Sequence, residues 1–272
     1  MKSLADFERA YSRLAAELAA GGTSPSPGET EFLASVEKRR RDYKGAIAFA
    51  DVLFLTAFVG VLSPSRVLEI GTLTGFSAGI IATALARRHI AGMGFRVDTI
   101  DIRSDCGVET SRATGFEITE FFPEVANAIR LHAPRDSAFV AQIAARNELE
   151  LAFIDADHRH PFVLLDLLRL APYLRPGGWI LLHDIRLGTL TREALAAGRP
   201  TPFEPVYGVE WLFNQWPFRK ISGGNIGAVQ LPLDRASLVP FTFRMLAIEF
   251  ETPPKQSRAL RRELFRALTQ LC

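Results

Sequence analysis

The stretch RVLEIGTLTGFS, residues 66–77, decides the fold class. Its first five residues form a branched apolar run with the length of a buried strand, and the apolar segment that follows, residues 76–89, has the length of a helix. Gly71 and Gly75 lie in the turn between them, where a doubly wound sheet binds its ligand and where glycines let the backbone pass close to that ligand. The stretch therefore predicts a nucleotide-like ligand at the carboxyl end of a first strand.

The spacing of these glycines disfavours two common ligands. The dinucleotide fingerprint G-x-G-x-x-G, begun at Gly71, would need glycines where Leu73 and Phe76 stand. No GK[ST] follows to form a phosphate-binding loop. A hydride-transfer cofactor and ATP are therefore both disfavoured.

The same alternation of strand and helix continues along the chain. Further runs of strand length lie at residues 95–102, 127–133, 149–155 and 178–184, and two closely connected runs follow at residues 218–224 and 225–232. The segment PFVLLDLLRLAPYL, residues 161–174, is typical of a crossover helix. Strands that are apolar on both faces and separated by helices predict an α/β fold with a doubly wound, Rossmann-like, mostly parallel seven-stranded sheet. The last of these strands is expected to run antiparallel at or near one edge.

Helical extensions are expected at both ends of this domain, which we place at residues 64–234. Residues 1–63 form an N-terminal helical extension that could act as a lid or as a dimer interface, and residues 235–272 form a C-terminal extension ending in a helix. The apolar segment 45–62 is shorter than the roughly 20 residues that span a bilayer and contains Asp51. It predicts a buried or interface-forming helix, so that the chain could form a homo-oligomer without spanning a membrane.

Composition limits the partners and the compartment. Of 272 residues, 48% are hydrophobic and 23% are charged, and the formal net charge of +2 gives no reason to expect a nucleic-acid partner. Cys106 and Cys272 are the only cysteines, which indicates neither a disulfide framework nor a thiolate metal cluster. The N-terminus has charges of both signs rather than the pattern of an export signal. We therefore expect a cytoplasmic protein whose partner is a small molecule.

The glycine turn has the form acidic-x-Gly-x-x-x-Gly, from Glu69 through Gly71 to Gly75, and ends in a helix that carries Ser77. In this it resembles the first motif of the class I S-adenosylmethionine (SAM)-dependent methyltransferases. SAM has no phosphates but carries a cationic amino group and a sulfonium, which suit an acidic turn lined by glycines. The alternative is a tight turn that the acidic side chain caps without any ligand.

The resemblance extends to two further cofactor positions. It implies that Asp101, at the end of the second strand, accepts hydrogen bonds from the ribose hydroxyls, although a solvated strand end is the alternative. It also implies that Asp136 and Ser137 read the adenine after the third strand. Family members often have a glycine where this chain has Arg135, which makes that position a departure.

The stretches FIDADHRHPF, residues 153–162, and LRPGGWILLHDI, residues 174–185, resemble a branch of the family that contains metal-dependent sugar and macrolide O-methyltransferases. That branch implies a magnesium-like divalent ion bound by Asp155, which we also assign to the cofactor site, and by Asp184. His183 stands where relatives have a carboxylate. Imidazole is a less natural ligand than carboxylate for a hard cation, so the metal is softer, or His183 has another task, or no metal binds.

The titratable residues within the first of these stretches suggest acid–base chemistry. His158 lies three residues after Asp155, where metal-dependent relatives carry a base, and an imidazole suits proton removal near neutral pH. We expect Asp157 to cap the next helix rather than to face the site, and His160, which precedes Pro161, to lie in a loop or at the surface. The alternative for the cluster is that its aspartates and His183 only bind backbone donors at strand ends.

The acceptor side is specified least. Four aromatic residues could line an acceptor pocket or could equally pack the segment that carries them: Tyr207, Trp211, Phe213 and Trp216. The sequence predicts a SAM-dependent methyltransferase that acts on a hydroxyl oxygen of a small molecule such as a sugar or a specialised metabolite, with or without a metal. The alternatives are an N-methyltransferase, another SAM-using enzyme, or a SAM-binding protein without catalysis.

Overall fold

The computed structural model describes residues 4–18, 25, 27–40, 47–88, 94–201 and 204–271. The chain divides into two compact units, Met1–Arg135 and Asp136–Cys272. This division falls elsewhere than the domain boundaries expected at residues 63 and 234, which remain predictions, as does the role of the N-terminal helices. Cys272 lies outside the described residues.

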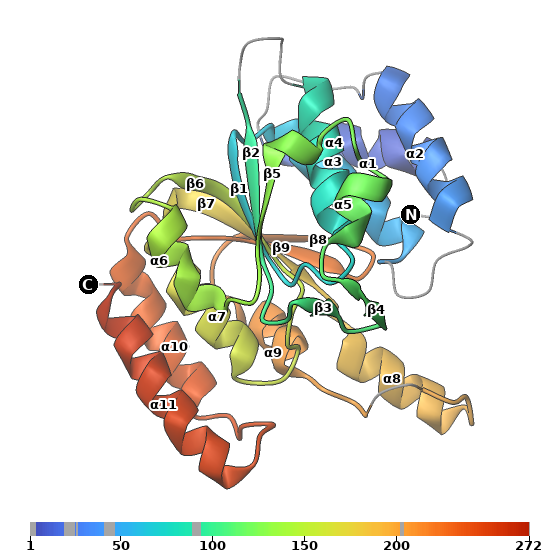
Figure 1. Ribbon diagram of the computed structural model, residues 1–272. Coiled ribbons are helices and arrows are strands. Elements are labelled where there is room, and N and C mark those ends of the chain that lie inside the picture. Colours follow the sequence, from blue (N-terminus) through green and yellow to red (C-terminus); the bar gives the residue numbers. More distant parts are fainter. Residues whose placement is uncertain are drawn as a thin grey trace. The chain divides into compact units, whose positions relative to one another are not determined.

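A seven-stranded sheet with the order β5-β2-β1-β6-β7-β9-β8 forms the core of the fold (Figure 1). Its strands are β1 (Arg66–Ile70), β2 (Arg96–Ile100), β5 (Ile129–His132), β6 (Leu149–Ile154), β7 (Leu174–His183), β8 (Lys220–Gly223) and β9 (Ile226–Gln230). The β1–β2, β2–β5 and β6–β7 pairs are parallel, whereas β9 runs antiparallel to both β7 and β8. The predicted doubly wound, mostly parallel sheet with an antiparallel strand near one edge is confirmed.

In the first unit, four helices from the N-terminal third of the chain pack together, and the last of them contacts the strands. These are α1 (Leu4–Glu17), α2 (Pro27–Arg40), α3 (Phe49–Leu62) and α4 (Phe76–Arg88). Helix α3 packs between α1 and α4, and every residue from Asp51 to Val61 is buried. The apolar segment that the sequence singled out is therefore a core helix. Within the part of the chain that the structure describes, no helix is both long and apolar enough to cross a membrane.

A small hairpin and short helices follow β2, and the sequence pattern did not predict them. They are β3 (Asp105–Cys106), β4 (Glu109–Ala113), α5 (Phe116–Glu120) and the 3-10 turn η1 (Ala126–Ala128). The hairpin is largely exposed apart from Cys106, so its residues lack the apolar alternation that marks a half-buried strand.

The second unit covers its strands with helices that include the C-terminal extension. They are η2 (Ser137–Phe139), α6 (Val140–Ile143), α7 (Phe162–Leu170), α8 (Leu187–Ala196), α9 (Gly208–Gln215), η3 (Arg235–Ser237), α10 (Leu238–Leu246) and α11 (Pro254–Thr269). The predicted crossover helix is α7, and α11 packs against it, as does α9. The C-terminal helix is thus part of the fold of this unit.

Candidate active site

The glycine turn after β1 has the backbone that its sequence predicts. Gly71 and Gly75 have φ angles of 99° and 88°, in the left-handed region that favours glycine. A Cβ atom on Gly75 would lie 2.6 Å from Cγ1 of Ile118 and 3.1 Å from Cα of Gly115. Both the backbone conformation and the close packing therefore require glycine at position 75.

Asp101 shapes this turn from the end of β2. Its Oδ2 accepts hydrogen bonds from the backbone N–H groups of Thr72 (3.0 Å) and Leu73 (2.9 Å), and its Oδ1 accepts one from Arg103 N (2.9 Å). An ionised carboxylate has about four lone-pair sites, so acceptor capacity remains for ligand hydroxyls. Its expected role in binding ribose remains a prediction.

Glu69 is fully buried in a network of hydroxyl groups beneath the turn. Its two carboxylate oxygens accept hydrogen bonds from Ser77 and from Thr99, both at 2.5 Å, and the Thr99 hydroxyl also lies 2.6 Å from that of Thr72. Glu69 therefore connects β1 to β2 and α4. Glu69, Ser77 and the turn are brought together as predicted, while their cofactor contacts remain predictions.

The pair expected to read adenine is held by an arginine that the sequence analysis missed. Asp136 accepts a hydrogen bond from Ala138 N (3.2 Å) and so caps η2, and its second oxygen pairs with Arg169 at 3.2 Å. Arg169 also donates to Ser137 Oγ (3.0 Å). Burial raises the pKa of the neighbouring Asp166 to about 6, against the opposing effects of the Ser137 hydrogen bond and the Arg169 charge. Any adenine contact by Asp136 or Ser137 remains a prediction.

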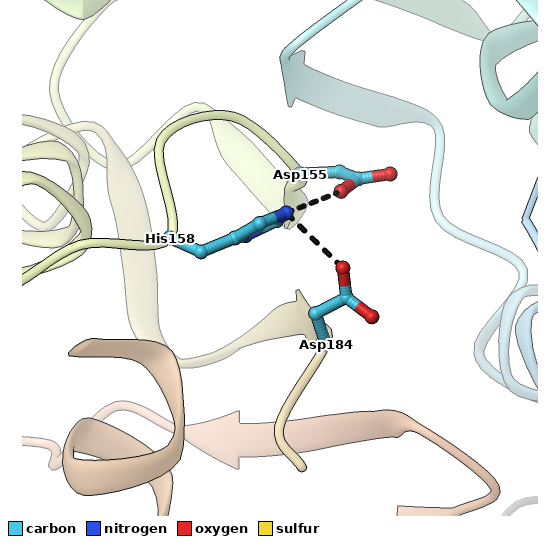
Figure 2. Close-up of side chains that lie close together, drawn as sticks. All are labelled: Asp155, His158 and Asp184. Atoms are coloured by element: carbon cyan, nitrogen blue, oxygen red, sulfur yellow. Dashed lines mark ion pairs between the residues drawn. The ribbon is translucent and has the colours of Figure 1, made fainter. Parts of the chain in front are cut away.

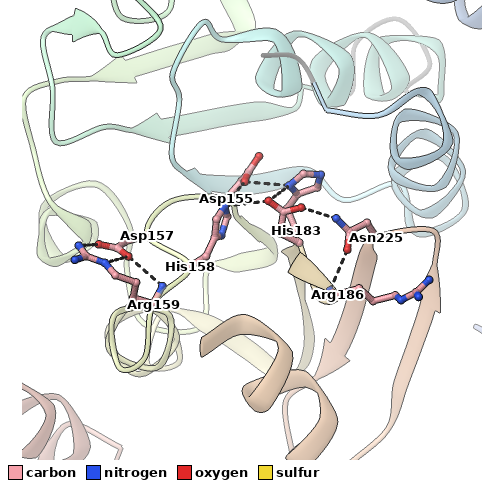
Figure 3. Close-up of polar contacts among 8 residues, drawn as sticks. Asp155, Asp157, His158, Arg159, His183, Arg186 and Asn225 are labelled. Atoms are coloured by element: carbon pink, nitrogen blue, oxygen red, sulfur yellow. Dashed lines mark hydrogen bonds and ion pairs between the residues drawn. The ribbon is translucent and has the colours of Figure 1, made fainter. Parts of the chain in front are cut away.

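Two carboxylates and two imidazoles converge at the ends of β6 and β7 (Figure 2 shows Asp155, His158 and Asp184, and Figure 3 adds His183). His158 Nε2 lies 3.1 Å from Asp184 Oδ2 and 3.8 Å from Asp155 Oδ1. His183 Nδ1 lies 3.2 Å from Asp155 Oδ1 and 3.5 Å from Asp184 Oδ2. The structure therefore brings together all four residues that the sequence assigned to the base and the metal.

Asp184 is fixed by a residue that the sequence analysis missed, Asn225 in the turn between β8 and β9 (Figure 3). Asn225 Nδ2 donates to Asp184 Oδ1, and Asn225 Oδ1 accepts from Arg186 N at 3.0 Å. Asp184 itself has a left-handed backbone with a φ of 61°, a conformation that aspartate tolerates better than most residues. Because Asn225 binds Oδ1, the other oxygen of Asp184 is the one that faces the two histidines.

The charges of the cluster stabilise one another. Burial disfavours the charged form of His158, but the hydrogen bond to Asp184 and the charge of Asp155 outweigh it, so the pKa of His158 is raised. Burial likewise disfavours the charged form of Asp184, but its hydrogen bonds to His158 and His183 hold the pKa of Asp184 well below its usual range. Without a bound cation, the cluster thus favours an ionised Asp184 beside a histidine that binds a proton more readily than a free imidazole does.

Comparison with known proteins identifies a domain within the chain. Residues 68–185 match the model of a methyltransferase domain, and this range contains the carboxyl end of β1, the glycine turn, Asp155 and Asp184. No curated protein sequence matches the chain.

The chain contains a methyltransferase domain.

Solved methyltransferase structures share the fold. One of them is the O-methyltransferase TomG of Streptomyces achromogenes, which is involved in tomaymycin synthesis and was solved with SAM. TomG is 17% identical to this chain, with a TM-score of 0.51, and the match covers 83% of this chain and 98% of TomG. A Staphylococcus aureus protein assigned as a caffeoyl-CoA O-methyltransferase is 14% identical and has a TM-score of 0.52, over 74% of this chain and 91% of that one. At this identity the likeness shows the fold alone.

The donor atoms of this methyltransferase fit a divalent cation. One oxygen each of Asp155 and Asp184 and one ring nitrogen of His158 all lie within 4.8 Å of one another, and His183 Nδ1 lies close to both carboxylates. Mixed oxygen and imidazole donors suit manganese, iron or zinc at least as well as magnesium. Asp155 and Asp184 would hold such an ion, with His183 in the position that relatives give to a carboxylate.

His160 lies in the loop before α7, as expected, but not at the surface, and the preferred prediction for Asp157 was wrong. His160 is fully buried, with its ring against Trp211 and Phe250, and burial lowers the pKa of this imidazole to about 4. Asp157 accepts from Arg159 N (3.0 Å) and pairs with the Arg159 guanidinium, so it bends the loop rather than capping α7. An aromatic pocket built by distant segments outweighed the surface preference of the His-Pro pair.

The four aromatic residues offered for an acceptor pocket largely pack the second unit. Trp216 is buried and contacts Phe241, and Phe213 is also buried. Tyr207 stacks on Trp211 at 5.5 Å and is only partly buried. Tyr207 and Trp211 are therefore the two that keep exposed surface for a ligand.

Proposed function

We propose that the protein transfers the methyl group of SAM to a hydroxyl oxygen of a small molecule, such as a sugar or a specialised metabolite. The observation that carries this proposal is the convergence of His158 on Asp155 and Asp184, within a domain that matches the methyltransferase model. A hydroxyl group must lose its proton as it attacks the sulfonium methyl carbon, and an imidazole beside two carboxylates can accept that proton.

The step balances with SAM as the only co-substrate. The acceptor oxygen forms a bond to the methyl carbon while the bond from that carbon to sulfur breaks, which leaves a methyl ether and S-adenosylhomocysteine. The hydroxyl proton passes to Nδ1 of His158, because Nε2 donates to the ionised Asp184, and Asp184 stabilises the imidazolium that results. A cation held by Asp155 and Asp184 would supply Lewis acidity and lower the pKa of the acceptor hydroxyl.

We assign cofactor binding to the residues that the motif identifies. In the first unit these are Glu69, Gly71, Gly75, Ser77 and Asp101, and in the second unit Asp136, Ser137 and Asp155. The support for the first set is its common location at the turn after β1, where two glycines and Asp101 bring backbone close to a ligand position.

The cellular setting is also proposed. A chain with two cysteines, of which Cys106 is a buried thiol in β3, suits a reducing cytoplasm. We propose self-association through the N-terminal helices and no nucleic-acid partner, in line with the modest net charge of +2.

Two measurements test the proposed function. Calorimetric titration with SAM tests the cofactor, and the absence of heat at millimolar SAM would contradict every enzymatic reading. Release of S-adenosylhomocysteine is then measured with two matched libraries of small acceptors that differ in carrying hydroxyl or amino groups. Turnover of the hydroxyl library supports O-methylation, whereas turnover of the amines alone establishes the N-methyltransferase alternative.

A further inference from the structure

Glu251, in the segment between α10 and α11, contacts the loop that carries His158. Its Oε2 accepts a hydrogen bond from His160 N (2.6 Å), and its Oε1 accepts one from Tyr207 N (2.8 Å). Its own N–H donates to His160 O at 2.8 Å. One side chain thus ties the loop after β6 to the residue that precedes α9, although Glu251 lies far beyond the residues that match the methyltransferase model.

The loop that carries His158 also packs tightly against the start of α9. The start of α9 lies directly against it, since Val209 N donates to His158 O at 3.2 Å. A Cβ atom on Gly208 would lie 2.3 Å from His160 N and 2.6 Å from His158 O. The backbone from His158 to His160 is therefore fixed by α9 and by Glu251.

The buried ring of His160 anchors the same loop. The centre of the His160 ring lies 5.2 Å from that of Phe250 and 6.0 Å from that of Trp211, edge-on in both cases. Phe250 directly precedes Glu251 in the chain, and Trp211 lies in α9. Hydrogen bonds that a carboxylate accepts are about twice as strong as neutral ones, and a part-buried N–H group that loses its acceptor has a large desolvation cost. Loss of the Glu251 carboxylate would therefore free the loop at His160 while the aromatic anchor remained.

We propose that Glu251 is a positioning residue that holds the His158 loop in the conformation in which His158 Nε2 meets Asp184. This assignment rests on the proposed role of His158 as the proton acceptor. Glu251 acts through the backbone of the loop and touches neither the base nor its carboxylate partners in any contact described above.

The test compares Glu251→Gln with Glu249→Gln, the same chemical change at an exposed position two residues away. Both variants and the wild-type full chain are labelled at histidine rings with carbon-13 and studied by NMR at one pH in the presence of chelator. The chain has five histidines, so His158→Gln identifies the His158 signal. His132, which pairs with Asp98 at 2.9 Å in the first unit, serves as an internal reference.

We expect Glu251→Gln to shift or split the His158 ring signal and to leave that of His132 in place. Glutamine keeps one acceptor oxygen, so we also expect hydrogen exchange to accelerate about tenfold or more at the one amide, His160 or Tyr207, that loses its acceptor. Glu249→Gln should change none of these. If hydrogen exchange accelerates but the His158 ring signal does not change, the proposal is overturned, because Glu251 then stabilises the loop without affecting the base. Unchanged exchange would overturn it as well.

A general loss of fold would appear as a simultaneous change at His132. Glu251→Asp, which keeps the charge and shortens the side chain, then replaces the first variant, and an unchanged His158 signal in that protein rejects the proposal. None of these readouts uses SAM or an acceptor. A protein that shows the expected shift but transfers no methyl group would therefore contradict the proposed function and leave the positioning role intact.

Discussion

Gly75→Ala gives the sharpest stability test of the glycine turn. A non-glycine residue at the φ of 88° observed here is disfavoured by about 1–2 kcal/mol. The added methyl group would lie 2.6 Å from Ile118 and 3.1 Å from the backbone of Gly115, and overpacking of a buried site costs about 1–3 kcal/mol more. We therefore expect the free energy of unfolding to fall by about 2–5 kcal/mol.

The control is Gly198→Ala. Gly198 has a similar φ of 69°, but a Cβ atom there would meet nothing within 4 Å, so this variant pays the backbone cost alone. Alanine also restricts the unfolded chain equally in both variants, so that effect cancels in the comparison. Urea denaturation followed by circular dichroism should show Gly75→Ala to be less stable than Gly198→Ala by about 1–3 kcal/mol. Equal stability of the two variants would refute the argument that close packing requires glycine in the turn.

Three further predictions concern the cluster around His158. First, His158→Gln should lower the rate of methyl transfer by about 10²–10⁴-fold and leave SAM affinity nearly unchanged. The control variant His132→Gln should alter the rate little. Equal losses of rate in both variants would count against a base at position 158. Second, Asp184→Asn should destabilise the chelated protein most between about pH 4 and pH 6.5, measured by thermal melts across pH. The lowered pKa of Asp184 adds stability that is present above about pH 4 and is lost on acidification. The raised pKa of His158 adds stability that is present below about pH 6.5 and is lost as pH rises through its folded pKa. A difference in stability that does not depend on pH would contradict the pairing. Third, calorimetric titration with Mn²⁺ should show binding to the wild type that Asp155→Asn weakens at least about tenfold, and equal affinity would remove Asp155 from the metal site.

The sequence predicted the sheet because most of its strands are short apolar runs that need no distant context to recognise. It also predicted that Asp155 and Asp184 would meet, because both directly follow neighbouring parallel strands, β6 and β7. The hairpin β3–β4 escaped prediction because most of its residues face solvent and alternate in no clear pattern.

The residues that support the site were beyond prediction for a different reason. Asn225 and Glu251 reach the cluster and its loop from 41 and 91 residues away along the chain from their partners Asp184 and His160. Neither occurs in a motif, and only the packing of the second unit brings them into range. The same packing buries His160, whose neighbour Pro161 had favoured an exposed loop.

The central claim is that this domain moves a methyl group from SAM to oxygen with His158 as the base. It is tested most directly with SAM carrying a carbon-13 methyl group, incubated with the hydroxyl-bearing acceptors and analysed by NMR for the atom to which the labelled carbon becomes bonded. The account predicts a labelled methyl ether formed by the wild type and at least about a hundredfold less of it formed by His158→Gln. A label found on nitrogen, or equal amounts of ether from both proteins, would contradict it.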